Sequence, residues 1–472
     1  KTEYDEEAGD VNIYIAKNAF TQQPSAENCF TADFNNPAAT LQWYEVEEEI
    51  IGTYVADSFS NLFTYNFKAG DILTVTVYNK SNSTAAIGFK IGSTSHTANI
   101  PAKAEGDVVY TLQAGDIVTV VDSRNNILGI GFAEAGNIAV KILAFENIKI
   151  DKFFWKERLS KAFELRKLMG LTDNEHTNCY RLVHSEGDNL PGLIIDIYGK
   201  TAVVQAQTEG MALNVKTIAE VLMNIDGLNI NSVYNKSSEA MQRMGKDAVE
   251  DGYLIGENSD DFVLENDSKF FVDWEGGQKT GFFLDQRFNR DLVRQLAKGK
   301  NVLNTFCYTG GFSVTALRGG ANKVVSVDCS KKAIAACEKN IALNGFDIKE
   351  NPSVAEDAKL FLQNMKKGEF DLIILDPPAF AKNHKSLHRG LQGYKFINNE
   401  AMKKIKEGGL LFTFSCSQAV DKAQFQSIVM AAAIEAGRKA QIIFQLDQPD
   451  DHPVNIYHPE GAYLKGLVLK ID

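Results

Sequence analysis

Two residues that could take part in chemistry follow short apolar runs. Asp376 comes directly after Leu372–Leu375, a run typical of a strand covered on both faces of a parallel sheet. Cys416 follows a second strand-like segment, Gly409–Phe414, and has a serine on each side. A carboxyl group can donate or accept a proton, and a thiolate is a nucleophile. Asp376 and Cys416 are therefore candidate catalytic residues.

The expected sheet brings these two residues together. After Asp376, Pro377 and Pro378 stiffen the backbone and lack N–H donors, so the chain cannot rejoin a sheet or begin a helix at once. In a doubly wound sheet with strand order 3-2-1-4-5, the fourth and fifth strands are neighbours and their carboxyl ends share one cleft. We therefore expect Cys416 beside Asp376. The alternatives are an ordinary Pro-Pro turn and an inert buried thiol.

A glycine loop earlier in the chain predicts a cofactor site at the same edge. The predicted strand Asn301–Phe306 leads into the paired glycines Gly310 and Gly311 and then a helix, and glycines allow a ligand to approach the backbone closely. The next strand ends at Asp328, where a carboxylate can accept both ribose hydroxyls of a nucleoside. The Gly-x-Gly-x-x-Gly pattern of dinucleotide sites is missing. A nucleoside cofactor without phosphates, S-adenosylmethionine, fits best.

The cofactor contacts are expected from the loop and from the strand ends beside it. Asp357, after the next short strand, is expected to accept a hydrogen bond from the adenine amino group. The other predicted cofactor contacts in this part of the chain are Phe306, Tyr308, Gly310, Gly311, Asp328 and Asp376.

The elements that position these residues divide the chain into four predicted regions. Residues 1–108 form a β-rich acidic module, and residues 109–146 contain three short strands. A helix over Asp151–Gly170, with Asp151 as its N-cap, opens an α+β domain that spans 147–275. Strands and helices then alternate over residues 276–472, which predicts an α/β domain. Together with the S-adenosylmethionine site expected above, this favours a Rossmann-like fold of the class I methyltransferase type.

Composition excludes several classes of protein. The apolar content of 44% and the charged content of 23% are those of a globular chain, and no apolar run reaches the roughly 18 residues of a membrane span. The six cysteines show no Cys-x-x-Cys pair, so we expect neither a disulfide framework nor a zinc site, and a reducing cytoplasm fits. The net charge of −12 is concentrated in residues 1–100, which hold 5 Lys, no Arg and 13 acidic residues. A basic surface on the later domains is still compatible with these numbers.

Seven segments together resemble a known family. They are Gly187–Leu193, Gly276–Arg287, Phe306–Phe312, Asp376–Phe380, Ser415–Ser417, Asp451–Pro453 and Glu460–Gly466. They are similar to the RNA 5-methylcytosine methyltransferases that act on bacterial large-subunit (23S) ribosomal RNA, over about residues 112–472. The resemblance implies a PUA domain, of which 109–146 matches the second half, a central α+β domain and a methyltransferase domain. The family's basic opening is replaced here by the acidic module.

The resemblance also implies roles for individual residues. The Asp-Pro-Pro loop, with Pro377 and Pro378, would position the target base, and Cys416 would be the nucleophile. Thr280 and Arg287 would hold the amino-acid end of the cofactor, which suits a guanidinium facing a carboxylate.

The resulting hypothesis is covalent catalysis on RNA. The Cys416 thiolate adds to carbon 6 of a cytosine, so that carbon 5 can accept a methyl group, and Asp376 offsets the charge on the ring. The base must be single-stranded or flipped, and Phe380 is expected to stack on it. The basic residues that follow, Lys382, Lys385, His388, Arg389 and Lys395, could contact phosphates or form a solvated loop.

Two other functions stay open at this point, as does a homodimer. One is a methyltransferase acting on another base, for example a guanine nitrogen, for which the Asp-Pro-Pro loop suffices without a thiol. The other is a non-catalytic RNA-binding assembly factor. No metal site is expected, because His384 and His388 have helical spacing but no carboxylate partner.

Overall fold

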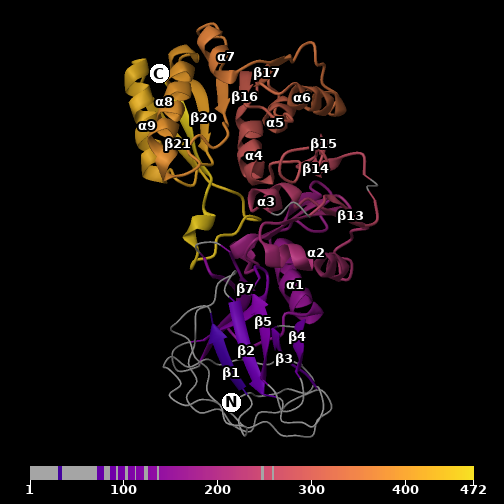
Figure 1. Cartoon of the computed structure of the whole chain (residues 1–472). Coiled ribbons are helices and arrows are strands. Elements are labelled where there is room, and N and C mark those ends of the chain that lie inside the picture. Colours follow the sequence, from indigo (N-terminus) through magenta and orange to yellow (C-terminus); the bar gives the residue numbers. More distant parts are fainter. Residues whose placement is uncertain are drawn as a thin grey trace. The chain divides into compact units, whose positions relative to one another are not determined.

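Figure 1 shows the computed structural model of the chain, which describes residues 113–121, 126–135, 138–245, 249–257 and 260–472 and five earlier strands. The chain forms two compact units. One comprises residues 1–157, 206–221 and 240–249, and the other comprises 158–205, 222–239 and 250–472. No helix within the described ranges is both long and apolar enough to span a bilayer.

The described part of the first unit is rich in β-strands. β1 (Phe30–Phe34), β2 (Ile72–Tyr78) and β5 (Glu105–Thr111) pair antiparallel, and β3 (Ala85–Ile91) forms a hairpin with β4 (Thr94–Ile100). Most of the predicted module 1–108 lies outside the described residues.

A second antiparallel sheet follows in the same unit. It contains β6 (Ile117–Val121), β7 (Ile127–Ala133) and β8 (Val140–Ala144), which confirms the three short strands predicted from the sequence. Gly131 lies where β7 pairs with β8, and a Cβ there would lie 2.1 Å from the carbonyl oxygen of Lys141. A glycine is therefore required at this position of the β7–β8 pair.

The predicted helix after this sheet is α1 (Lys152–Leu168). Asp151 caps it, because its Oδ1 accepts the backbone N–H groups of Phe153 (2.9 Å) and Phe154 (3.1 Å). The last apolar residue of the helix, Leu168, has a side chain that is 85% exposed. Leu168 is the last helical residue, and Gly170 then turns the chain with a φ of 70°.

A five-stranded mixed sheet follows, in the order β13-β12-β11-β10-β9. β11 and β12 run parallel, whereas β9 with β10 and β12 with β13 run antiparallel. The strands are β9 (Cys179–His184), β10 (Leu193–Tyr198), β11 (Thr201–Ala206), β12 (Ser232–Asn235) and β13 (Gly252–Ile255). Helices α2 (Glu209–Leu222) and α3 (Ser238–Arg243) flank β12 in sequence, and β14 (Val263–Glu265) pairs with β15 (Ser268–Phe270) after the sheet. The predicted α+β character is confirmed.

The remaining strands form a seven-stranded sheet in the order β18-β17-β16-β19-β20-β22-β21. The first five of these are parallel, so the predicted order 3-2-1-4-5 is confirmed. β22 runs antiparallel to both of its neighbours. The strands are β16 (Asn301–Thr305), β17 (Lys323–Asp328), β18 (Ser353–Ala355), β19 (Leu372–Leu375), β20 (Gly409–Ser415), β21 (Ala440–Leu446) and β22 (Lys465–Ile471).

Helices cover both faces of this sheet. Leu372 and Ile374 of β19 pack in one buried cluster with residues of α4 (Arg287–Leu296), α5 (Gly311–Arg318) and α6 (Lys331–Leu343). Ile373 and Leu375 point to the other face, against α7 (Ala358–Asn364), α8 (Leu387–Lys404) and α9 (Lys422–Ala436). This alternation explains why β19 is apolar at every position.

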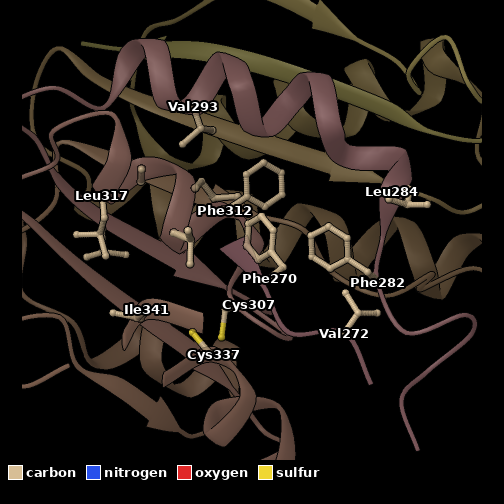
Figure 2. Packing of buried hydrophobic residues seen from close by; sticks show 14 of the residues in the cluster. Phe270, Val272, Phe282, Leu284, Val293, Cys307, Phe312, Leu317, Cys337 and Ile341 are labelled. Atoms are coloured by element: carbon tan, nitrogen blue, oxygen red, sulfur yellow. The ribbon is translucent and has the colours of Figure 1, made fainter. Parts of the chain in front are cut away.

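Figure 2 shows the first of these two buried layers. Phe312 of α5 lies beside the ring of Phe270, the last residue of β15, and Phe282 lies on the other side of Phe270. Val293 of α4 belongs to the same cluster. Phe270 and Phe282 are 4.9 Å apart between ring centroids. The core therefore fixes the start of α4, whose first residues lie at the candidate site.

Candidate active site

Three neighbouring parallel strands deliver the predicted site residues to one edge of the sheet. β16 leads into the glycine loop, β19 ends before Asp376, and β20 ends before Cys416. β19 pairs with both β16 and β20, with Leu375 opposite Thr305 on one side and opposite Thr413 on the other. The chain therefore brings the cofactor loop and both candidate catalytic residues to the same strand ends.

The thiol of Cys416 lies beside the Asp-Pro-Pro loop, as predicted. Its Sγ is 3.9 Å from the carbonyl oxygen of Pro377, and the side chain is half-buried. Burial, followed by the nearby Asp376 carboxylate, raises the pKa of Cys416 to about 11. In this arrangement the sulfur is a protonated thiol at neutral pH, so a change at the site must accompany any attack by it.

Asp376 is held by an oriented amide. Gln286 Nε2 donates a hydrogen bond to Asp376 Oδ1 (3.0 Å), and Asn289 donates to Gln286 Oε1 (2.6 Å), which fixes the amide's orientation. Burial and then the charge of Asp285 raise the pKa of Asp376 to about 7. Asp376 can therefore supply a proton near neutral pH.

Asp285 and Tyr463 are site residues that the sequence reasoning missed. The Tyr463 hydroxyl donates to Asp285 Oδ2 at 2.6 Å, although the two residues are 178 positions apart in sequence. Both lie inside segments that carry the family resemblance, Gly276–Arg287 and Glu460–Gly466. Their position in these segments was the only indication in the sequence that they belong to the site, and it did not predict that the two residues contact each other.

The cofactor loop has an unusual backbone. Phe306 and Tyr308 have positive φ values of 56° and 47°, and Gly310 has a φ of 81°. Left-handed backbone at residues other than glycine costs roughly 1–3 kcal/mol and is concentrated at functional sites. The Tyr308 N–H donates to Asp328 Oδ2 at 3.0 Å, which ties the loop to the end of β17. Gly311 is the first residue of α5, so the loop ends at a helix N-terminus.

Other contacts close this loop against the preceding segment. The Gln278 N–H donates to the Tyr308 hydroxyl (3.1 Å), and that hydroxyl donates to the Gly281 carbonyl oxygen (3.2 Å). Cys307 is buried in the apolar cluster beside Cys337, as Figure 2 shows, which indicates a packing role.

Thr280 and Arg287 are buried in a polar network. Thr280 donates to Asp196 at 2.6 Å, and Asp196 also holds the Arg181 guanidinium. Arg287 Nη2 donates to Asp451 Oδ2 at 2.6 Å, while its Nε and Nη1 have no hydrogen-bond partner among the described residues. The role at the amino-acid end of the cofactor that the resemblance implies for Thr280 and Arg287 stays a prediction.

Asp357 is an N-cap in this structure. Its Oδ1 accepts the N–H groups of Lys359 (2.8 Å) and Leu360 (3.2 Å) at the start of α7, and the side chain is exposed. One carboxylate oxygen is thus committed to the helix. The predicted contact with an adenine amino group would use the other oxygen.

The predicted substrate residues surround the Asp-Pro-Pro loop. The ring of Phe380 lies 6.4 Å from that of Phe306 and 4.8 Å from that of Tyr394, which links the substrate loop to the cofactor loop. Pro377 is buried and Pro378 is exposed. The basic residues Lys382, Lys385, His388 and Arg389 are exposed as well. Lys395 instead forms an ion pair with Glu435 at 2.5 Å.

Ser417 and Lys465 fix the end of β20. The Ser417 hydroxyl lies 2.8 Å from the Tyr394 hydroxyl and accepts the Ala381 N–H at 3.1 Å. The Lys465 ammonium donates to the Ser417 carbonyl oxygen at 2.7 Å. The residue that follows Cys416 is therefore held by groups of other elements. Within the described ranges, His, Cys, Asp and Glu side chains form no group of three that could bind a metal ion.

Comparisons with known proteins agree with this arrangement. Residues 234–468 match the family described as S-adenosylmethionine-dependent methyltransferase, and residues 100–145 match a PUA-like domain. The methyltransferase match contains the glycine loop, Asp376 and Cys416, so the cofactor of this domain is S-adenosylmethionine.

Curated relatives match most of the chain. Ribosomal RNA large subunit methyltransferase I of Tolumonas auensis is 39% identical over 376 residues, which cover 78% of this chain and 94% of the relative. The protein of the same name from Alteromonas mediterranea is 40% identical over 363 residues, covering 76% and 90%.

Solved structures share the fold. A methyltransferase solved in complex with SAH has a TM-score of 0.65 at 24% identity and covers 76% of this chain and 92% of its own. A SAM-dependent methyltransferase from Streptococcus mutans has a TM-score of 0.66 at 23% identity, covering 76% and 93%. From these matches and the site, we conclude that the chain belongs to the ribosomal RNA large subunit methyltransferase I family of S-adenosylmethionine-dependent methyltransferases.

Proposed function

We propose that this chain methylates carbon 5 of a cytosine in large-subunit ribosomal RNA through a covalent adduct with Cys416. The names of its relatives support ribosomal RNA as the substrate. The observation that carries the proposed chemistry is the position of the Cys416 thiol, 3.9 Å from the carbonyl oxygen of Pro377 and next to Asp376.

The chemistry of cytosine explains why a thiol is needed. Carbon 5 of the free base is a poor nucleophile, but addition of a thiolate to carbon 6 moves electron density onto carbon 5 and ring nitrogen 3. A proton donated to nitrogen 3 offsets that charge. Asp376, with a pKa raised to about 7, is a suitable donor because roughly half of it is protonated at neutral pH.

The same proton also favours ionisation of the thiol. The Asp376 carboxylate is one of the charges that raise the pKa of Cys416. When Asp376 is neutral and hydrogen-bonded to the base, that contribution is lost and the thiolate becomes easier to form. Binding of cytosine and activation of Cys416 are therefore linked through one carboxyl group.

The residues around the glycine loop suit S-adenosylmethionine. The Asp328 carboxylate lies at the end of β17, where it can accept ribose hydroxyls, and the backbone of Phe306–Gly311 leads into α5. Thr280, Arg287 and Asp357 are the proposed further contacts. The bound cofactor supplies an electrophilic methyl group.

The exposed side of the Asp-Pro-Pro loop is the proposed RNA surface. Its aromatic ring, Phe380, is half-buried and can stack on an unpaired or flipped base, while Lys382 and Arg389 are exposed and can contact phosphates. Pro377 and Pro378 would hold the base against Asp376. An enzyme that acts on ribosomal RNA would work in the cytoplasm.

The high pKa of Cys416 favours one competing function. A methyltransferase that acts on a ring or amino nitrogen needs an acceptor such as Asp376 but no thiolate, and burial, with the nearby Asp376, raises the pKa of Cys416 to about 11, which disfavours the thiolate. A variant without the thiol separates the two functions, because only the carbon 5 reaction requires it.

The decisive experiment is methyl transfer from labelled S-adenosylmethionine to unmodified large-subunit ribosomal RNA, followed by nucleoside analysis. Wild type, Cys416→Ala and the control Cys329→Ser, which changes an exposed cysteine, are compared. The proposal expects 5-methylcytosine with wild type and control, and none with Cys416→Ala. Label on another nucleoside, or 5-methylcytosine formed by Cys416→Ala, would exclude the proposed mechanism.

A further inference from the structure

One carboxylate at the site has no place in the steps above. Asp285 is 92% buried, as its exposed fraction of 8% shows. Its Oδ2 accepts the Tyr463 hydroxyl at 2.6 Å, and its Oδ1 has no hydrogen-bond partner among the described residues. A buried carboxylate oxygen without a partner costs free energy, commonly about 1–3 kcal/mol or more. A carboxylate in this state is available to accept a proton.

Tyr463 brings this carboxylate to the end of β20. In the antiparallel pair β20–β22, Lys465 lies opposite Ser415, so the residues just before Lys465 run alongside the residues just after Ser415. Tyr463 thus lies next to the strand end that carries Cys416. Its hydroxyl then reaches Asp285.

Gln286, the residue after Asp285, contacts the candidate catalytic residue Asp376. Gln286 donates to Asp376 at 3.0 Å, and Asp376 precedes the carbonyl group that contacts Cys416 Sγ. The dipeptide Asp285–Gln286 therefore joins Tyr463 on one side to Asp376 on the other. Tyr463 and Asp376 both lie at the carboxyl ends of β19 and β20, where the Cys416 thiol also lies.

The two carboxyl groups have pKa values shifted in opposite directions. The pKa of Asp376 is raised to about 7, by burial and then by Asp285. Burial also raises the pKa of Asp285, but the charges of Lys279 and Arg181 and the Tyr463 hydrogen bond lower it, so its net pKa is lowered. At neutral pH one group can hold a proton while its neighbour is ionised. Such a divided pair is typical of an acid and a base in one site.

We propose that Asp285 is the base that removes the carbon 5 proton from the methylated cytosine adduct, with Tyr463 as its positioning residue. This inference rests on the proposed function and supplies its last step. The carbon 5–hydrogen bond breaks and the proton passes to the Asp285 carboxylate. The electron pair forms the carbon 5–carbon 6 double bond, the carbon 6–sulfur bond breaks, and Cys416 leaves as a thiolate. Ring nitrogen 3 returns its proton to the Asp376 carboxylate, so the product is neutral 5-methylcytosine.

The other groups near the site suit this step less well. Asp376 is engaged with nitrogen 3, and the Lys465 ammonium is a donor to the Ser417 carbonyl oxygen. His452 is the competing base, because its pKa is lowered, principally by burial, and its Nε2 has no hydrogen-bond partner among the described residues. His452 Nδ1 lies 3.1 Å from Asp451, which leaves Nε2 as its available acceptor, so the test includes a His452 variant.

The test uses the full chain, unmodified large-subunit ribosomal RNA and methyl-labelled S-adenosylmethionine. After RNase digestion, denaturing gels separate labelled nucleotide bound to protein from free 5-methylcytosine. The variants are Asp285→Asn, Tyr463→Phe, His452→Gln and Asp285→Asn combined with Cys416→Ala. Asp291→Asn is the matched control, since that carboxylate pairs with Arg294 on the outer part of α4. Asparagine can still accept the Tyr463 hydrogen bond, so the fold should be preserved.

The expected result is an enzyme that methylates but does not release. Asp285→Asn should accumulate methyl-labelled protein–RNA adduct at close to one per enzyme, with product release slowed at least about 100-fold, and the double variant should show no adduct. Tyr463→Phe should give the same adduct at a lower level, because Asp285 is present but not oriented. If Asp285 had only a structural role, its replacement would not cause a methylated adduct to accumulate.

The contrary results are equally clear. Normal turnover by Asp285→Asn, or complete loss of both adduct and product in a variant that still binds S-adenosylmethionine, would overturn the inference. Adduct trapped by His452→Gln but not by Asp285→Asn would assign the base to His452 instead. If wild type itself makes no 5-methylcytosine, the proposed function fails and this inference with it. Failure of the inference alone leaves wild-type product intact.

Discussion

Replacing Asp376 with Asn should make the Cys416 thiol easier to ionise. Burial and then Asp376 raise the pKa of Cys416 to about 11, and Asp376, with its own pKa raised to about 7, is mostly charged above that pH. Asparagine keeps the shape of the side chain and an oxygen that can accept from Gln286, but it carries no charge. The pKa of Cys416 should therefore fall.

The size of the fall follows from the geometry. Cys416 Sγ is 3.9 Å from the carbonyl oxygen of Pro377, the residue after Asp376. The distance between the thiolate and the Asp376 carboxylate is therefore taken to be about 6 Å. At an effective dielectric constant of about 40 they interact by about 1.4 kcal/mol, or about one pKa unit. At about pH 8.5 the thiolate fraction should rise roughly tenfold, from about 0.3% to about 3%.

Alkylation by iodoacetamide, followed by mass spectrometry of the peptide containing Cys416, measures this fraction without RNA or cofactor. The rate for Asp376→Asn should exceed that of wild type about tenfold at about pH 8.5. The ratio should approach one below about pH 6, because Asp376 is then neutral in wild type too. Asp291→Asn should leave the rate unchanged. An equal or slower rate for Asp376→Asn above pH 8 would refute the assumed coupling between these groups.

Three further predictions follow from the same structure. Arg166→Met should lower the free energy of unfolding by about 3–5 kcal/mol in urea titrations, because it leaves Asp188 buried without its bidentate partner. Asp328→Ala should weaken S-adenosylmethionine binding at least about tenfold by calorimetry, since it removes both the proposed ribose acceptor and the acceptor of the Tyr308 N–H. Phe380→Ala should raise the KM for RNA about tenfold, because loss of base stacking costs about 1–3 kcal/mol. Unchanged values in these assays would count against the assigned roles.

The order of the large sheet and the meeting of Asp376 with Cys416 could be predicted because parallel sheets obey strong rules. An apolar strand ending in a polar residue identifies a carboxyl end, and neighbouring carboxyl ends share an edge. β19 is apolar at all four positions and is buried on both faces, as expected. This rule was therefore sufficient to predict that Asp376 and Cys416 lie at the same edge of the sheet.

The partners of Asp285 and Arg287 could not be predicted in this way. Tyr463 and Asp451 belong to the irregular chain before β22, and no periodic pattern relates a loop residue to a side chain more than 160 positions away. The resemblance implies that Arg287 holds the amino-acid end of the cofactor, but it gave no indication that Arg287 also pairs with Asp451. Leu168, the last residue of α1, is apolar but exposed, and helical periodicity alone gives no information on where packing stops.

The insertion of β22 between β20 and β21 has a consequence for how the enzyme matures. β21 precedes β22 in the chain, yet in the described sheet it pairs only with β22, so during synthesis it must wait for a strand that emerges later from the ribosome. Asp376 and Cys416 can be in place before that happens. Tyr463 cannot reach Asp285 until β22 docks beside β20. If Asp285 and Tyr463 have the proposed roles, a partly synthesised chain would release its product slowly, which ties efficient turnover to the docking of β22.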